Sequence, residues 1–168
     1  NMTGVSAFAS SLGAKRLGLL HELVPAADPI AFLSNPSSTF AKTQLEDVQG
    51  AAARVGVQLV VAYAQAESEF EGGFETFTRR RAGALIVPAE PFFNSRRDPL
   101  VALAEHHKLP TIYGQREYVA AGGLVSYGTS LANAYRQLAN YAGRILKGAK
   151  PADLPVLQPT RFELVVNL

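Results

Sequence analysis

The chain has no cysteine, and its charges nearly cancel. The lack of cysteine excludes disulfide bonds, thiolate metal sites and cysteine nucleophiles, and it agrees with a bacterial exported protein. The 16 basic and 14 acidic residues leave a net charge of +2. A balance this even gives no field that favours nucleic acid or an anionic membrane, so we expect neither as a partner.

Long apolar runs are also missing. No run reaches the length of about 18 residues that a membrane-spanning helix needs. No signal peptide is present, and residue 1 is Asn rather than Met, so we expect an internal piece of a longer, exported protein. Hydrophobic residues make up 48% of the 168 positions, which is enough for the core of one domain.

Apolar strand-like segments alternate with helix-like ones along the chain. The clearest helix pattern spans 39–55, where apolar residues recur at steps of four and three and Gly56 is placed as a C-cap. The strands are expected at 30–34, 57–63, 84–87, 110–113, 123–127 and 162–166. The helices are expected at 10–24, 39–55, 67–81, 95–107 and 130–147, the last with Leu131, Leu138, Ala142 and Ile145 facing inward.

This order predicts an α/β fold of three layers, α/β/α, around a mainly parallel, doubly wound sheet. Ligands of such sheets bind beyond the carboxyl ends of the strands. Three loops are therefore candidates for a binding site.

The first candidate loop joins a strand to a helix N-terminus. Free backbone N–H groups and hydroxyls at such a place suit a carboxylate or another anion. The alternative is that Ser38 or Thr39 only caps the helix. The candidate residues are Asn35, Pro36, Ser37, Ser38 and Thr39.

The second candidate loop holds Glu90, Pro91 and Phe92, followed by Phe93. One phenylalanine facing outward would stack on an apolar or ring portion of a ligand, although both can also be buried. Glu90 can accept a hydrogen bond from an amine or a hydroxyl.

The third candidate loop holds Tyr113, Gln115 and Arg116. The guanidinium of Arg116 can bind a carboxylate with two parallel hydrogen bonds. The alternative is a surface ion pair with Glu117 that contributes little.

Motifs of catalysis are missing. The sequence has no phosphate-binding P-loop, no G-x-G-x-x-G after the first strand and no G-x-S-x-G elbow. The adjacent His106 and His107 diverge around a helix, and His21 lies on another, so we expect no metal site. We therefore expect no catalytic residue, no cofactor and no enzyme activity.

Several stretches together resemble one known family. They are the opening NMTGVS, the segment IAFLSNP at 30–36, the segment RILKG at 144–148 that leads into KPADLPV, and the ending FELVVNL. Their order and spacing resemble the substrate-binding proteins of ABC transporters, of the tryptophan/tyrosine type.

The resemblance covers the whole chain and implies one lobe of a two-lobed type I periplasmic binding protein. Residues 1–168 would be the second lobe, and 123–150 a returning segment that belongs to a missing first lobe. Without that lobe, the helix over 130–147 would expose an apolar face or form a homodimer through it. The resemblance places the hinge near Thr3, Gly4, Tyr127, Gly128 and Thr160.

The function implied is capture of a small solute by hinge closure in the periplasm, with delivery to an ABC permease. Amino-acid-binding relatives often carry a small residue and Asp in the third loop, where this chain has Gly114-Gln115-Arg116. An aromatic or carboxylate-bearing compound is therefore favoured over a free amino acid. Two alternatives remain open: an effector lobe of a regulator with the same fold, and a flavodoxin-like enzyme domain.

Overall fold

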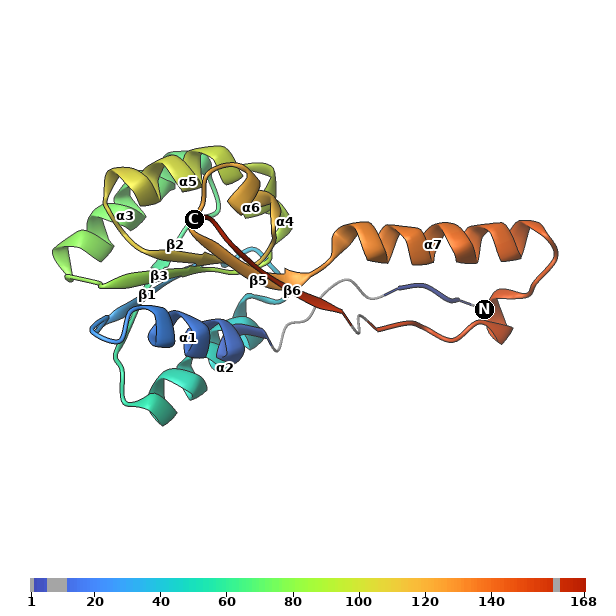
Figure 1. Ribbon diagram of the computed structural model, residues 1–168, viewed down its shortest axis with the longest axis horizontal. Helices are drawn as coiled ribbons and strands as arrows, with labels where there is room; N and C mark the ends of the chain where they lie inside the picture. The colour runs from blue at the N-terminus through green and yellow to red at the C-terminus, as the bar shows by residue number, and fades with distance from the viewer. Residues whose placement is uncertain (1, 6–11, 159–160) are drawn as a thin grey trace.

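Six strands form one mixed sheet in the computed structural model, which describes residues 2–5, 12–158 and 161–168 (Figure 1). The strands are β1 (Ile30–Ser34), β2 (Leu59–Tyr63), β3 (Ala84–Val87), β4 (Thr111–Tyr113), β5 (Val125–Thr129) and β6 (Phe162–Val166). Their order is β2-β1-β3-β4-β5-β6, with β6 antiparallel to β5 and the other neighbours parallel. The predicted α/β fold class is confirmed.

Helices cover both faces of this sheet, which gives three layers (Figure 1). The helices are α1 (Gly13–Leu23), α2 (Ala41–Val55), α3 (Phe70–Arg79), α4 (Pro91–Ser95), α5 (Arg97–His106), α6 (Glu117–Ala120) and α7 (Leu131–Leu146), with short 3-10 turns η2 (Glu67–Glu69) and η3 (Pro151–Asp153). The pair α1 and α2 lies on one face, and α3, α5 and α6 lie on the other. No helix within the described ranges is long and apolar enough to cross a membrane.

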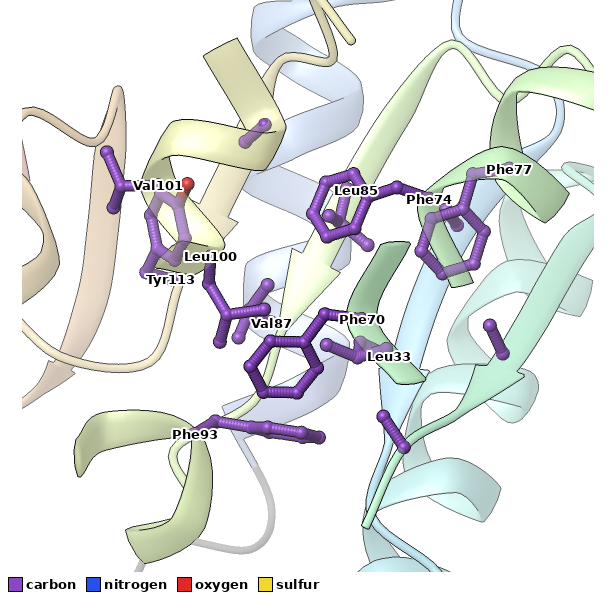
Figure 2. Packing of buried hydrophobic residues seen from close by; sticks show 14 of the residues in the cluster. Leu33, Phe70, Phe74, Phe77, Leu85, Val87, Phe93, Leu100, Val101 and Tyr113 are labelled. Carbon is purple, nitrogen blue, oxygen red and sulfur yellow. The ribbon is translucent and has the colours of Figure 1, made fainter. Parts of the chain in front are cut away.

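The two faces have separate cores. Phe70, Phe74 and Phe77 of α3 are almost fully buried against β1, β3 and α5 (Figure 2). Leu17 and Leu20 of α1 pack on the opposite face. The sheet is covered on both sides there, and every residue of β1 is buried, as expected for a central parallel strand.

The structure departs from the predicted elements around residue 96. The helix expected over 95–107 is present as α5, but the loop expected before it contains a further short helix, α4, which begins at Pro91 and is capped by Glu90, and the chain bends at Arg96 between the two helices. Proline at the first helical position lacks only a donor that would be unpaired anyway. The four-residue α6 was not predicted, since it is too short to show a period.

A second departure concerns α7. This helix projects away from the sheet instead of packing on it (Figure 1). Leu138 and Ile145 are 39% and 37% exposed, and Ala142 is exposed as well. The expectation that they face inward is wrong, because no layer of the sheet lies beneath them. The exposed apolar face is the one expected from the resemblance.

Two extended segments accompany α7, and we call residues 2–5 and 130–158 the arm and the other described residues the body. Tyr141, which is 8% exposed, donates a hydrogen bond from its Oη to the Pro155 carbonyl at 2.8 Å. Leu157 N donates to Gly4 O at 2.9 Å, and Val5 forms a bridge with Leu157. The arm is thus held by contacts with itself, and among the described strands β5 and β6 lead from it into the body.

Candidate functional site

Buried polar side chains gather near one edge of the body, where the parallel strands end. Arginine, carboxylate and amide groups are normally exposed unless they have partners or a function. The buried polar residues near the carboxyl ends of the strands are Arg16, Ser34, Asn35, Gln44, Glu90 and Gln115. Two further buried polar residues of the described chain, Thr111 and Ser126, lie elsewhere. We call the first group, with its loops, the carboxyl edge.

The first loop at this edge is ordered by Asn35. Its Oδ1 accepts a hydrogen bond from Ser37 N at 3.0 Å, and its Nδ2 donates to Glu90 at 3.2 Å. Pro36, Ser37 and Thr39 are exposed, and Ser38 is half-buried. The alternative to a binding role for this loop was that Ser38 or Thr39 only caps α2. The N-cap of α2 is instead Phe40, without a side-chain capping bond.

Glu90 ties the first loop to the second. One carboxylate oxygen accepts from Asn35 and the other from Phe93 N at 3.1 Å, which caps α4. Glu90 is only 6% exposed, and Gln44 Nε2 adds a bond to the Ala89 carbonyl at 3.2 Å. Two loops far apart in sequence are therefore fixed in one arrangement before any ligand arrives.

The two adjacent phenylalanines of the second loop have different surroundings. Phe93 is fully buried beside Phe70 (Figure 2). Phe92 is half-buried, and the guanidinium of Arg96 lies 4.3 Å from the centre of its ring. Pro91 is exposed. Phe92 and Pro91 therefore form the apolar part of the surface at this loop.

Tyr113 does not lie on the surface of the third loop. It is 1% exposed and stacks on Tyr118 with 4.5 Å between the ring centres. Alternation along β4 sends Ile112 to the α1 face and Tyr113 to the α5 face, into the core. Burial raises the pKa of both Tyr113 and Tyr118. As placed, Tyr113 is a core residue and is not exposed at the carboxyl edge.

The other two candidates of the third loop remain near the edge. Gln115 is 8% exposed. Arg116 is exposed, and its Nη1 lies 3.5 Å from a carboxylate oxygen of Glu163 on β6. The surface ion pair considered for Arg116 thus exists, but its partner is Glu163 rather than Glu117.

Two glycines let the loops approach one another. A Cβ on Gly114 would overlap the backbone of Ala89, and one on Gly128 would overlap the Gly114 carbonyl. Any larger residue would separate the ends of β3, β4 and β5. Of the positions expected at the hinge, Tyr127 and Gly128 lie on β5, whereas Thr3 and Gly4 lie in the arm, and Thr160 is outside the described residues.

The sequence analysis missed Arg16 and Gln44. Arg16 is 3% exposed, and its Nε donates to the Tyr127 carbonyl at 2.7 Å. Burial lowers its pKa to about 10, and the charge of Asp47 opposes that shift, so Arg16 is a cation at neutral pH. A signal existed for both: each stands four residues before a buried apolar residue, Leu20 or Val48, on the inward face of its helix.

One cavity lies away from the carboxyl edge. It has a volume of about 510 Å³ and lies at the amino end of β4, lined by residues such as Ala104, Leu109, Thr111 and Leu124. Among the described residues, no three His, Asp or Glu side chains are placed to hold a metal ion.

Solved structures share this fold. A conserved domain protein from Vibrio cholerae matches with a TM-score of 0.86 and 23% identity, over 99% of this chain and 55% of that one. An ABC domain in complex with L-Trp from Streptococcus pneumoniae matches with a TM-score of 0.84 and 26% identity, over 99% and 57%. A LacI family transcriptional regulator from Mycobacterium smegmatis shares the fold at 17% identity, with a TM-score of 0.70 over 99% and 65%.

The chain therefore spans little more than half the length of the first two of these proteins. No curated protein sequence matches it. Residues 1–168 match, over their whole length, the family described as ABC transporter substrate binding protein. The chain belongs to that family.

Proposed function

We propose that this chain is the second lobe of a two-lobed substrate-binding protein of an ABC importer, and that its carboxyl edge forms one wall of the ligand cleft. The observation that carries this proposal is the network at that edge. Asn35, Glu90 and Gln44 are buried, and their hydrogen bonds hold two loops in place. Such preorganisation lowers the entropy cost of binding a small molecule.

The ligand that this wall suits is an aromatic or carboxylate-bearing solute. Phe92 and Pro91 offer an apolar surface, and the exposed Ser37 and Thr39 near the start of α2 offer hydroxyls. The relative from Streptococcus pneumoniae is in complex with L-Trp, a compound with both an aromatic ring and a carboxylate. The site residues proposed are the loop residues 35–39, Glu90, Pro91, Phe92, Gln115 and Arg116.

The arm supports the proposal of a second lobe. An amphipathic helix with Leu138 and Ile145 exposed is unfavourable unless another surface covers it. We propose that residues 123–150 complete the first lobe, and that the chain crosses between lobes near Gly4, Gly128 and Thr160. Hinge closure about these crossings would trap the solute, and a permease would recognise the closed form. The protein would act in the periplasm.

Thermal denaturation of the longer, two-lobed protein tests the ligand proposal. A solute present at 100 times its Kd stabilises the folded state by about 2.7 kcal/mol. We expect at least one aromatic amino acid or aromatic acid to raise Tm, and Asn35→Ala to weaken that effect. Glu71→Gln, an exposed change on α3, serves as the control. The absence of any shift across such a panel would overturn the proposal.

An effector lobe of a regulator is the second candidate, because LacI family regulators share the fold. The two functions differ in what accompanies the lobe. A regulator's gene would encode a DNA-binding domain, and its product would shift an operator fragment in a gel. A transport protein's gene would lie beside genes for a permease and an ATPase.

A further inference from the structure

Arg16 is a cation placed in the body's interior. It lies in the first turn of α1, on the same buried side as Leu17 and Leu20, and it is 3% exposed. Among the described residues, its one hydrogen bond runs from Nε to the Tyr127 carbonyl. A guanidinium has five N–H donors, so the described residues engage only one of the five.

No carboxylate of the chain neutralises this cation directly. Asp47 is close enough to raise the pKa of Arg16, but no carboxylate oxygen of the described residues lies within 4.0 Å of the guanidinium. The positions outside the described ranges are 1, 6–11 and 159–160, and they contain no Asp or Glu. A buried cation without a carboxylate beside it is costly, which favours an anionic group that is not part of this chain.

The position of the guanidinium identifies where that partner would bind. A Cβ on Gly128 would lie 3.7 Å from Nη2 of Arg16, so the terminal amino groups face the end of β5. This is where the chain passes from the body into the arm, beside Gly114 of the third loop. Arg16 thus stands at the inner end of the carboxyl edge, at the crossing toward the proposed second lobe.

We infer that Arg16 binds the carboxylate of the transported solute. This inference rests on the proposed function and names the anionic group of its ligand. Nε is held by Tyr127, which fixes the plane of the guanidinium and presents the terminal amino groups as a preformed fork. Arg116, the cation that sequence alone favours, is exposed and already faces Glu163, so it is the weaker anion receptor.

Matched acids and amides test the inference in the two-lobed protein. The probes are benzoate and benzamide, indole-3-acetate and indole-3-acetamide, and L-tryptophan and its amide. We expect the acid of at least one pair to bind more tightly than its amide. Arg16→Met should weaken binding of the acid by about 10- to 100-fold, the loss expected for charged hydrogen bonds, and leave binding of the amide nearly unchanged.

Two further variants separate a binding role from a structural one. Lys15→Met removes the neighbouring, solvent-facing cation of α1 and should leave affinity unchanged. Arg16→Lys keeps the positive charge but lacks the two parallel donors of a guanidinium. Its affinity for the acid should lie between that of the wild type and that of Arg16→Met. This variant keeps the test valid even if Arg16→Met folds poorly.

The outcomes are distinguishable. Unchanged affinity of Arg16→Met for the acid, or binding of amides alone, would overturn the role of Arg16 and leave the proposed function standing. Absence of binding by every acid and amide would overturn both.

Discussion

The body and the arm differ in how far their apolar side chains are buried. In the body, a parallel sheet is covered on both faces, and residues such as Phe74 and Leu33 have no exposed surface. In the arm, one helix and two extended segments support each other through a few contacts, and Leu146 is 88% exposed. The body has a buried core on each face of its sheet, whereas the apolar residues of α7 are largely exposed. The chain therefore carries one folding unit with a buried core and one extension whose helix exposes apolar side chains.

The largest expected difference concerns the cores. Phe74→Ala in the body should lower the free energy of unfolding by about 3–5 kcal/mol, because it empties a fully buried site. Tyr141→Ala in the arm should change the unfolding of the body by no more than about 0.5 kcal/mol, since distant sites are nearly independent. Urea denaturation followed by far-ultraviolet circular dichroism measures both. A similar loss in the two variants would show that the arm and body unfold as one unit.

Alkaline pH provides the next contrast, because burial raises the pKa of Tyr113 and Tyr118 in the body. In the unfolded chain, tyrosine loses its proton at about pH 10. Above that pH the unfolded state binds fewer protons than the folded one. Stability should therefore be intact below about pH 10 and fall by about 1.4 kcal/mol per pH unit for each of the two residues.

Denaturation midpoints between pH 8 and 11 measure this loss. Tyr118→Phe should remove the contribution of that residue, about 1.4 kcal/mol per pH unit, from the slope. The Tyr118 hydroxyl is buried without a hydrogen-bond partner among the described residues, so the same variant should also be about 1 kcal/mol more stable at neutral pH. A slope that does not change in Tyr118→Phe would contradict the assignment.

The body could be predicted from sequence far better than the arm, for a physical reason. Strands buried on both faces read as short apolar runs, and β1, β3 and β6 were predicted with their observed bounds. The period of α7 was also correct. An apolar stripe predicts that one face of a helix packs against another surface, but it does not identify that surface. In this chain the stripe of α7 does not pack on the sheet.

The sequence predicted which loops form the candidate site, but not which of their side chains are exposed there. The rule for parallel sheets placed three loops at the carboxyl edge, and the structure brings them together through Glu90 and Gly114. Tyr113 was misplaced because the face to which the last residue of a three-residue strand points depends on register. Arg16 was missed because its partner, the Tyr127 carbonyl, is 111 residues away in the chain.

A smaller effect is expected at the start of the arm. Ser130 is the N-cap of α7, and its Oγ accepts a hydrogen bond from Asn133 N at 3.4 Å. Ser130→Ala should destabilise α7 by about 1 kcal/mol and speed hydrogen exchange of its amides severalfold, while amides of β1 and β3 keep their protection. Faster exchange throughout the body would mean that the cap stabilises more than the arm.

The smallest expected effect on stability belongs to the exposed face of α7. Replacing both Leu138 and Ile145 by serine should change the free energy of unfolding of the body by less than about 0.5 kcal/mol, because neither residue contacts the core of the body.

We expect this double substitution to change self-association instead. If a second copy covers the arm when the other lobe is absent, sedimentation of the 168-residue chain will show a dimer that forms with rising concentration, and the double variant will remain a monomer. Arg136→Ser, an exposed polar change on the same helix, should leave the dimer intact. A dimer that survives the double substitution would place the interface elsewhere. A wild-type chain that stays monomeric at all concentrations would show that the exposed apolar face of α7 does not cause self-association.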